Sequence, residues 1–471
     1  MPSWINARIL YNCRIHGHDA RDTALAIEKD RIVAIGSDAE LLNAGTGIEK
    51  EDLAGGYVMP GITDSHIHLD LYAQSLQYVE CATATRQECL QRVADKASST
   101  PPGTWIHGHG WNQNLWSDGF GSAQELDGVT SNHPVFLTDK SLHSAWVNSK
   151  ALSLAGIDAT TPDPFGGTIQ RDSQGIPTGI LFEKAVDLVE KIIPPLPQDQ
   201  LVKYLRVAQE KLLSYGVTSV HDFDRIPCFS ALQQMDADGT LILRVLKSIP
   251  FEQLDSAVSL SLMTGYGNAH LRIGSIKMFS DGALGPHTAA MLWPYEGNPD
   301  QSGTLLLSSQ AILDAGIKAG RSGLSLAIHA IGDRATREVL QGFALLRQYE
   351  TAHELPHLMH RIEHMQLVDP ADIPLAARLG ICLSMQPVHL YMDMSTADRI
   401  WGDRSRYAYA LRSLQSTGAM IIFGSDAPVE TPNPFWGIHA AVSRRTRDMS
   451  PVSASWYPQE LISLSDAYTT G

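Results

Sequence analysis

Two histidines separated by one residue are the sharpest chemical signal in the sequence. His66 and His68 belong to the segment Asp64–His68, which lies shortly after Met59-Pro60-Gly61. Residues i and i+2 of a strand point to the same side, so the two imidazoles could share one cation. Zinc prefers nitrogen ligands in such short-spaced sets. Two ordinary polar surface histidines would give the same pattern, and the motif alone leaves both interpretations open.

Three further residues of ligand type come at the ends of apolar runs far along the chain. His329 ends one run, His364 follows Arg361-Ile362-Glu363, and Asp426 follows a run that begins at Ile421. If each run is a strand of one barrel, the strand ends converge on one site. Taken singly, each histidine could instead be a hydrogen-bonded core residue, and Asp426 could cap a helix.

Lys277 interrupts the apolar run 271–279. A lysine inside a buried strand must be neutral, paired or chemically altered, because an unpaired buried charge is costly. Reaction with CO₂ would convert it into an anionic oxygen ligand able to bridge two metals. The alternatives are a side chain that reaches out of the barrel or an ion pair with Asp281.

Eight short apolar runs are the candidate strands that would position these residues. They are residues 57–68, 216–222, 241–246, 271–279, 324–329, 361–364, 381–385 and 420–426. Several intervals between them, such as 200–213 and 335–349, have helix-like patterns. Buried strands that alternate with helices predict a parallel sheet. Eight such units predict an α/β fold, a TIM-like (β/α)₈ barrel.

Two segments fall outside these repeating units. Residues 1–58 contain a hairpin signal around Glu28-Lys29-Asp30 and predict a small β-sandwich module. Within the predicted barrel, 59–471, the interval 69–215 is too long for one helix and predicts an insertion after the first strand that caps the active site. This insertion contains four tryptophans, Trp105, Trp111, Trp116 and Trp146. They could bind an apolar or aromatic group of a substrate, or they could simply pack in the core.

Composition narrows the possible function classes. The formal net charge is −15 and no Lys/Arg run would follow a phosphate backbone, so nucleic acid is not expected as a partner. The five cysteines form no Cys-x-x-Cys pair and indicate reduced thiols in the cytoplasm. No secretory signal is recognised, and no stretch approaches the roughly 18 apolar residues of a membrane span. We expect a cytoplasmic protein with no membrane partner, and a homodimer as the default assembly.

Longer segments show that the chain resembles the amidohydrolase superfamily, and within it the branch that includes N-substituted formamide deformylases. The matching segments are GGYVMPGITDSHIHLD, KSLHSAWVNSKALSLAGI, GGTIQRDSQGIPTGIL, KMFSDGALGPHTAAML, AIHAIGDRA, HRIEHMQ and FGSDAPVETPNPFWGIHAAVSR. The resemblance runs from about residue 24 to the C-terminus, and several of the segments are long and distinctive.

The resemblance implies a binuclear centre with about two Zn²⁺ ions per chain, or another divalent metal. It places His66, His68 and Asp426 on the more buried ion. His329 and His364 would hold the other ion, and a carboxylated Lys277 would bridge the two. A mononuclear variant is the alternative.

The resemblance also indicates residues that could bind substrate. His143 belongs to a segment similar to one that the family places near the substrate. Trp111, Gln386 and His389 are weaker candidates for substrate binding. For each of these residues, a packing or surface role is equally open.

The implied reaction is hydrolysis of a carbon–nitrogen bond, of amide or formamide type and other than a peptide bond, in a small-molecule substrate. A metal-bound water would lose a proton near neutral pH and attack the carbonyl carbon. Asp426 would pass this proton to the leaving amine. Hydrolysis of a carbamate, cyclic amide or ester stays open. A catalytically silent binding protein is a further alternative, but all six candidate ligand positions hold competent residue types.

Members of this superfamily usually end with further strands that complete the small β module. This sequence ends at Gly471 without them. The expectation is either a truncated chain or an incomplete module, whose unpaired strand edges would favour aggregation or pairing with another chain.

Overall fold

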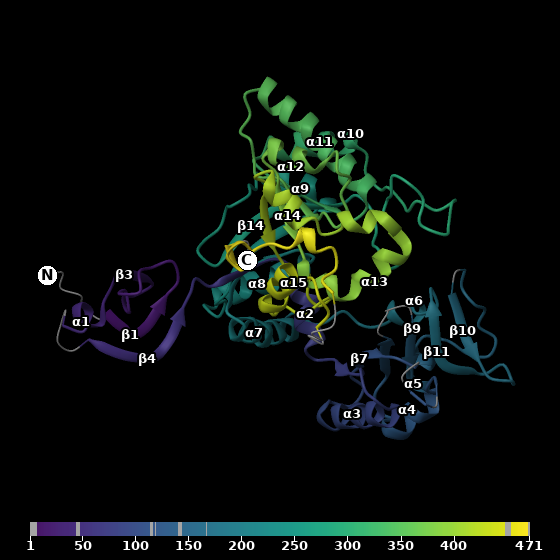
Figure 1. Cartoon of the computed structure of the whole chain (residues 1–471). Coiled ribbons are helices and arrows are strands. Elements are labelled where there is room, and N and C mark those ends of the chain that lie inside the picture. The colour runs from purple at the N-terminus through teal and green to yellow at the C-terminus, as the bar shows by residue number, and fades with distance from the viewer. Residues whose placement is uncertain are drawn as a thin grey trace. The chain divides into compact units, whose positions relative to one another are not determined.

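The computed structural model of the 471-residue chain describes residues 7–43, 48–113, 116–117, 119–139, 144–165, 167–447 and 454–469. Its strands form three sheets, of four, six and eight strands (Figure 1). By its internal contacts the chain separates into two compact units. One is Met1–Thr63 with Gly216–Ser219, and the other is Asp64–Tyr215 with Val220–Gly471. Within the described part, no helix is both long and apolar enough to cross a membrane.

The four-stranded sheet has the order β3-β2-β1-β4. Its strands are β1 (Ala7–Ile15), β2 (Ala24–Glu28), β3 (Arg31–Gly36) and β4 (Glu49–Val58). The predicted hairpin is confirmed as the antiparallel pair β2–β3, with Lys29 in the turn at a φ of 56°. Helix α1 (Asp38–Leu41) packs Leu41 against Ile9, Ala24 and Ala26. The described residues of this region form one sheet, and a second facing sheet stays a prediction.

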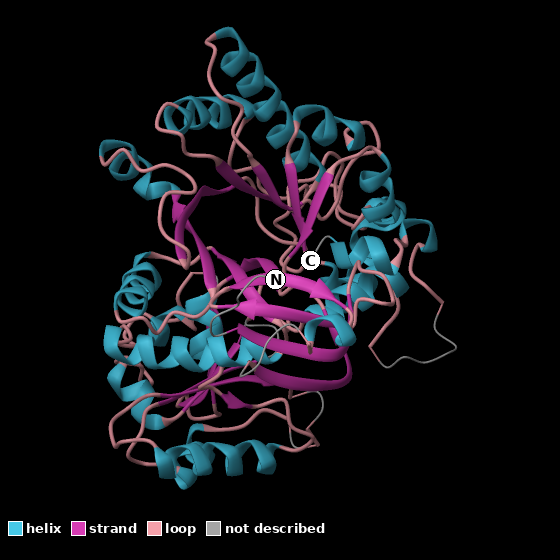
Figure 2. Ribbon diagram, turned by 90° about the vertical axis from the view of Figure 1, so that its left-hand side faces the viewer, coloured by secondary structure: helices cyan, strands magenta, loops and turns pink. Residues whose placement is uncertain are grey.

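The eight-stranded sheet forms the predicted barrel, and Figure 2 shows helices along its outer side. In the order in which they neighbour one another, its strands are β18 (Met420–Phe423), β17 (Cys382–Met385), β16 (Arg361–His364), β15 (Leu326–Ala330), β14 (Leu271–Phe279), β13 (Arg244–Pro250), β12 (Val217–Asp222) and β5 (Ile62–Ile67). The pairings from β13 to β18 are all parallel. The order confirms the α/β barrel.

Two predicted strands differ from the structure by more than three residues at one end. The run that begins at Tyr57 is divided at Pro60-Gly61, so that Tyr57 and Val58 end β4 and a new strand, β5, begins at Ile62. The strand predicted at 241–246 instead runs from Arg244 to Pro250. The strand includes Lys247 and Ser248, and both side chains are buried.

Helices follow most of the barrel strands. They are α2 (Leu69–Ser75), α7 (Gln198–Ser214), α8 (Ile226–Ala237), α9 (Leu254–Ser259), α10 (Ser309–Gly320), α11 (Asp333–Ala352), α12 (Ile373–Leu379), α13 (Leu390–Trp401), α14 (Leu411–Ser416), α15 (Pro434–Ser443) and α16 (Leu464–Thr469). Short 3₁₀ turns are η1 (Phe251–Gln253), η2 (Pro387–His389), η3 (Gly402–Tyr407) and η4 (Pro458–Glu460). The predicted helices 200–213 and 335–349 lie within α7 and α11. Leu340 and Phe343 of α11 share one buried core with Ile276, Ile328 and Leu383 of the strands.

The interval between β5 and β12 contains the six-stranded sheet, in the order β10-β11-β9-β8-β7-β6. Its strands are β6 (Val79–Glu80), β7 (Ile106–Trp111), β8 (Val135–Asp139), β9 (Ser144–Val147), β10 (Gly167–Arg171) and β11 (Pro177–Glu183), and its helices are α3 (Arg86–Ser99), α4 (Ala123–Val129), α5 (Ser149–Leu154) and α6 (Asp187–Glu190). β7 begins directly after Trp105, and β8 begins directly after Pro134. That this insertion caps the active site stays a prediction.

Candidate metal centre

The six predicted ligands lie at the carboxyl ends of barrel strands. His66, Lys277, His329 and His364 belong to β5, β14, β15 and β16. His68 directly follows β5, and Asp426 lies three residues after the end of β18. The ring centres of His66 and His364 are 4.8 Å apart, and those of His329 and His364 are 4.6 Å apart. The barrel therefore brings together side chains that are separated by up to 360 positions.

Asp426 lies against both histidines of the His-x-His pair. Its Oδ1 is 3.5 Å from His66 Nε2 and 3.4 Å from His68 Nε2. One donor atom of each of the three residues lies within 4.8 Å of the others. Gly424 allows this approach, because a Cβ at that position would lie 2.5 Å from the backbone nitrogen of His66. These three residues form a candidate metal site.

The backbone at this edge is held in an uncommon conformation. Asp426 has a φ of 58° and His364 a φ of 73°, both in the left-handed region that non-glycine residues rarely adopt. Asp426 N donates to the main-chain oxygen of His66 at 2.7 Å, which fixes the turn after β18. Strained positions of this kind concentrate at functional sites.

Each of the four imidazoles has one nitrogen hydrogen-bonded to an oxygen of the protein. The pairs are His66 Nδ1 with Glu363 Oε2 (2.7 Å), His68 Nδ1 with Asp224 Oδ1 (3.1 Å), His329 Nε2 with the main-chain oxygen of Gly282 (2.9 Å), and His364 Nδ1 with Gln386 Oε1 (2.7 Å). The Gln386 amide is oriented by its nitrogen, which donates to Ser384 O at 3.1 Å. These oxygens accept, so the imidazole nitrogens donate, and the opposite nitrogen of each neutral ring keeps a lone pair.

The free nitrogen of His66 tests whether the site fits a cation. Among the described residues, His66 Nε2 is buried and has no hydrogen-bond partner. A buried polar atom without a partner is costly, and a metal ion would satisfy it. Imidazole nitrogens beside a carboxylate form a donor set that suits zinc. The residues therefore fit the implied metal.

Burial keeps three of the imidazoles neutral. It lowers the pKa of His66 to about 4 and that of His329 to about 3, with the charge of Lys277 acting in the same direction. The pKa of His364 also falls well below its usual value, because the ring is buried and lies beside His329 and His66. Neutral imidazole is the form that binds metals.

His68 and Asp426 have the opposite electrostatics. Burial acts to lower the pKa of His68, but the hydrogen bonds to Asp224 and Asp426 outweigh it and raise the pKa to about 10. Burial acts to raise the pKa of Asp426, but His66 and His68 hold it well below its usual value. The carboxylate is thus ionised and favours a positive charge at this point, whether proton or metal ion.

Lys277 is buried, with 4% of its surface exposed. Its Nζ lies 4.5 Å from the ring centre of Phe223 and 4.9 Å from that of Phe279. Burial lowers the pKa of Lys277 to about 8 despite the negative charges of Glu363 and Asp426. The alternative pairing with Asp281 is not seen, because the Asp281 carboxylate accepts hydrogen bonds from the backbone amides of Ala290, Ile331 and Gly332.

Several residues that support the ligands were not singled out in the sequence analysis. Glu363, which is fully buried, accepts from His66 and from Arg361 Nε at 2.8 Å. Asp224 accepts from His68, and the neighbouring Asp222 forms an ion pair with Lys247. The available signal was an acidic residue one or two positions from a strand end, as in Arg361-Ile362-Glu363-His364 and Asp222-Phe223-Asp224.

The predicted substrate-binding residues have different surroundings. Gln386 contacts His364, and His389 Nε2 lies 3.3 Å from Ser425 O and 3.9 Å from Asp426 Oδ2. Trp111 is 1% exposed in the core of the six-stranded sheet, and its indole nitrogen donates to Leu137 O at 2.8 Å. These contacts favour packing for Trp111. His143 lies outside the described residues.

A shallow, open cavity lies beside the segments that follow His68 and Asp426. It has a volume of about 330 Å³ and is lined by Tyr72, Ser75, Pro428, Val429, Glu430, Thr431, Pro432 and Arg447. Glu430 and Arg447 form an ion pair across it. The size suits a small organic group.

Comparisons with known proteins agree with this geometry. Residues 49–470 match the model of the amidohydrolase family. A putative amidohydrolase of Bacillus subtilis, YtcJ, is 32% identical over 90% of this chain and 81% of its own length. N-substituted formamide deformylase of Arthrobacter pascens is 28% identical over 98% of this chain and 87% of its own. A crystal structure of an uncharacterized metal-dependent hydrolase from Pyrococcus furiosus superposes with a TM-score of 0.80, at 30% identity, over 98% of this chain and 92% of that one.

Proposed function

The chain belongs to the amidohydrolase family, and from this premise we propose that it hydrolyses a carbon–nitrogen bond of amide or formamide type in a small molecule. The observation that carries the proposal is the convergence of ligand-type side chains at one edge of the barrel. Four imidazoles, each with one nitrogen fixed by the protein, meet the ionised Asp426 and the buried Lys277 there.

His66, His68 and Asp426 would hold one divalent ion, most simply zinc. His329 and His364 would hold a second, and carboxylated Lys277 would be shared between the two. When bound, such ions supply Lewis acids that polarise a carbonyl oxygen and acidify a water molecule. The unpartnered His66 Nε2 supports the first of these positions.

Asp426 has the position and charge of a proton carrier. Its Oδ1 faces the two histidines of β5, and its Oδ2 lies 3.9 Å from His389 Nε2. As an ionised carboxylate it can accept a proton from an attacking water. It can then return that proton to the leaving nitrogen, which must be protonated before the carbon–nitrogen bond breaks.

Lys277 can become an anionic ligand by reaction with CO₂. The neutral amine Nζ would attack the carbon of CO₂, a nitrogen–carbon bond would form, and the nitrogen would lose a proton to give a carbamate. A pKa of about 8 leaves more neutral amine at physiological pH than a solvated lysine has. Burial thus supports the modification at this position.

The cavity beside Tyr72 and Val429 is the proposed place for the substituent of the substrate. It adjoins both segments that carry ligands, and most of its lining outside the Glu430–Arg447 pair is uncharged. The similarity to an N-substituted formamide deformylase supports a formamide with a group on its nitrogen as the first substrate to test.

The test begins with metal content. Protein purified without chelator is expected to contain about two zinc ions per chain, a number that should fall in His66→Ala and in Lys277→Ala because both remove ligands. His270→Ala is the matched control, since His270 is exposed and precedes β14 at the opposite end of that strand. Elemental analysis measures the ratio. The loaded protein is then assayed on an N-substituted formamide, an amide, a carbamate, a cyclic amide and an ester.

Three outcomes separate the possibilities. Two ions with formamide or amide turnover support the proposal. If the protein binds one ion and Lys277→Ala still binds it, Lys277 does not bridge two ions and the protein is a mononuclear hydrolase. Wild-type protein that takes up no zinc, even when zinc is in excess, would rule out the proposed centre.

A further inference from the structure

Lys247 lies in a buried cluster of charges next to the proposed metal centre. It belongs to β13 and is 1% exposed. Its Nζ lies 2.7 Å from Asp222 Oδ2 and also donates to the main-chain oxygen of Asp224. A buried ammonium group is tolerated only when it is paired and hydrogen-bonded in this way.

The two carboxylates of the cluster hold His68 and the helix that follows it. Asp224 Oδ1 accepts from His68 Nδ1 at 3.1 Å, and Asp224 Oδ2 accepts from the backbone amide of Asp70. Asp222 Oδ1 accepts from the backbone amide of Leu69 at 2.9 Å. The imidazole of His68 and the first turn of α2 are therefore fixed by the carboxylates that Lys247 neutralises.

The cluster also contains residues of the types that bind metal ions. Donor atoms of Asp222, Asp224 and Cys228 lie within 4.8 Å of one another. Lys247 already supplies the positive charge between the carboxylates. The thiol of Cys228 is a poor ligand, because burial and the charge of Asp222 raise its pKa well above the usual value. The cation of this cluster is thus the lysine.

We propose that Lys247 is a positioning residue of the metal centre, whose ammonium group holds Asp222 and Asp224 so that His68 presents Nε2 toward Asp426. The inference rests on the proposed function, because it concerns one ligand of the proposed centre. It differs from a purely structural role in what it predicts: loss of the charge should weaken metal binding specifically.

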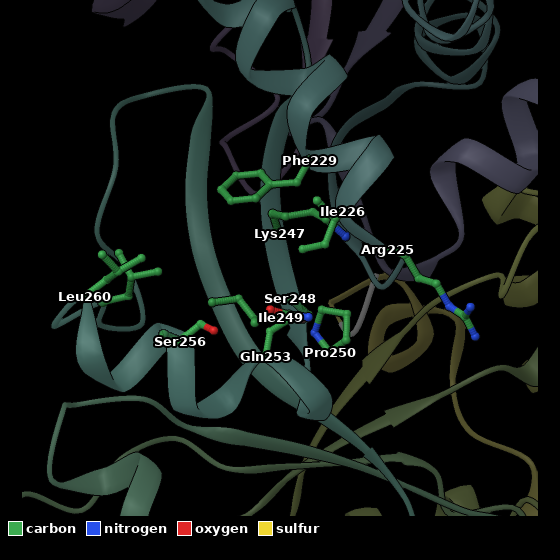
Figure 3. A pocket seen from close by; sticks show the side chains of 12 residues that line it. Arg225, Ile226, Phe229, Lys247, Ser248, Ile249, Pro250, Gln253, Ser256 and Leu260 are labelled. Atoms are coloured by element: carbon green, nitrogen blue, oxygen red, sulfur yellow. The ribbon is translucent and has the colours of Figure 1, made fainter. Parts of the chain in front are cut away.

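The surroundings of Lys247 offer a direct test of the charge. Figure 3 shows Lys247 on the wall of a cavity beside Ile226 and Phe229 of α8. The cavity has a volume of about 170 Å³ and a mainly apolar lining. Lys247→Ala would join the space of the deleted side chain to this cavity. The n-propylammonium ion has the three carbons and the ammonium group that this substitution removes, and it can enter.

The experiment measures zinc dissociation constants by competition with a chromophoric chelator, together with the number of ions bound. Lys247→Ala and the similarly sized Lys247→Met should bind zinc about 10- to 100-fold more weakly than the wild type, as loss of a group that orients a ligand does. Millimolar n-propylammonium should restore part of the affinity of Lys247→Ala, and the bulkier tetramethylammonium ion, which has no N–H, should not.

A matched control removes a different partly buried cation. Arg347 Nη1 lies 2.6 Å from Glu350 Oε2, away from the centre, and Arg347→Met should lower stability without changing the zinc affinity. If Lys247→Ala does not fold, Asp224→Leu replaces it, since this variant has a side chain of similar size and removes the oxygen that accepts from His68. An additional zinc ion that enters the vacated cluster and restores affinity would also support the proposal.

Unchanged affinity in folded Lys247→Ala without an additional bound zinc ion, or in folded Asp224→Leu, would overturn the inference while leaving the metal centre in place. Equal losses in Lys247→Met and Arg347→Met, or a loss that n-propylammonium does not relieve, would assign the effect to packing and overturn it as well. Absence of zinc from the wild type would overturn both this inference and the proposed function.

Discussion

The orientation of each imidazole is decided by a single oxygen atom of a neighbouring residue. For His364 this atom is Gln386 Oε1, which lies 2.7 Å from His364 Nδ1, and both side chains are buried. A hydrogen bond of this kind selects the tautomer and points the opposite nitrogen to the metal position. Gln386 would thereby act on the proposed centre through His364, and its contact with substrate stays a prediction.

Substitution of Gln386 separates these two roles. In Gln386→Leu the Nδ1–H of His364 loses its acceptor, so we expect zinc affinity to fall about 10- to 100-fold. Gln386→Glu keeps an oxygen at the same place and should retain most of the affinity. Titration with a zinc-binding dye measures both variants. A raised KM with unchanged zinc affinity in Gln386→Leu would favour the substrate contact instead.

At the scale of elements, one buried carboxylate joins the segments that follow β14 and β15. Asp281 accepts from the backbone amides of Ala290 at 2.9 Å, Ile331 at 3.0 Å and Gly332 at 2.8 Å. Gly332, the N-cap of α11, packs directly on this junction, since a Cβ there would lie 2.0 Å from the main-chain oxygen of Ala290. The backbone angles of Gly332 (φ −78°, ψ 156°) suit any residue. The close approach of Ala290, and not the backbone conformation, is therefore what requires glycine here.

Gly332→Ala should therefore destabilise the protein through overlap with Ala290. The expected loss is about 1–3 kcal/mol, as for other overpacking substitutions. Gly285→Ala is the control, because a Cβ at that position meets no atom within 4 Å. Urea unfolding followed by circular dichroism measures both variants. Equal stabilities would show that the junction can yield at little cost, since the overlap at 2.0 Å requires a shift of roughly 1 Å.

At the scale of the whole molecule, the proposed ligands connect the first and last strands of the barrel sheet. β5 and β18 stand at opposite ends of the strand order. Their carboxyl ends meet through His68 N, which donates to Ala427 O at 2.9 Å, and Asp426 N, which donates to His66 O at 2.7 Å. An ion held by His66, His68 and Asp426 would add a further link at this closure.

Metal removal should accordingly lower the melting temperature of the protein. A ligand that binds only the folded state stabilises it by about 2.7 kcal/mol when its free concentration is 100 times its dissociation constant. Differential scanning calorimetry with chelator, and then with zinc restored, measures the shift. His66→Ala should melt near the chelated wild type and respond little to zinc. An equal response of wild type and His66→Ala would place the stabilising ion elsewhere.

Much of this protein can be predicted from local sequence patterns. The period of apolar residues predicted the eight barrel strands, and ligand-type residues at their ends predicted which side chains would meet, because the strands of a barrel deliver their carboxyl ends to one site. The predicted bounds of a strand were wrong where a charged residue lies inside it. Lys247 belongs to β13, and its burial is possible because it forms an ion pair with Asp222. Only the tertiary structure decided which oxygen orients each imidazole. Glu363 and His66, for example, are 297 positions apart. Such contacts depend on side chains from different strands, and no local pattern records them.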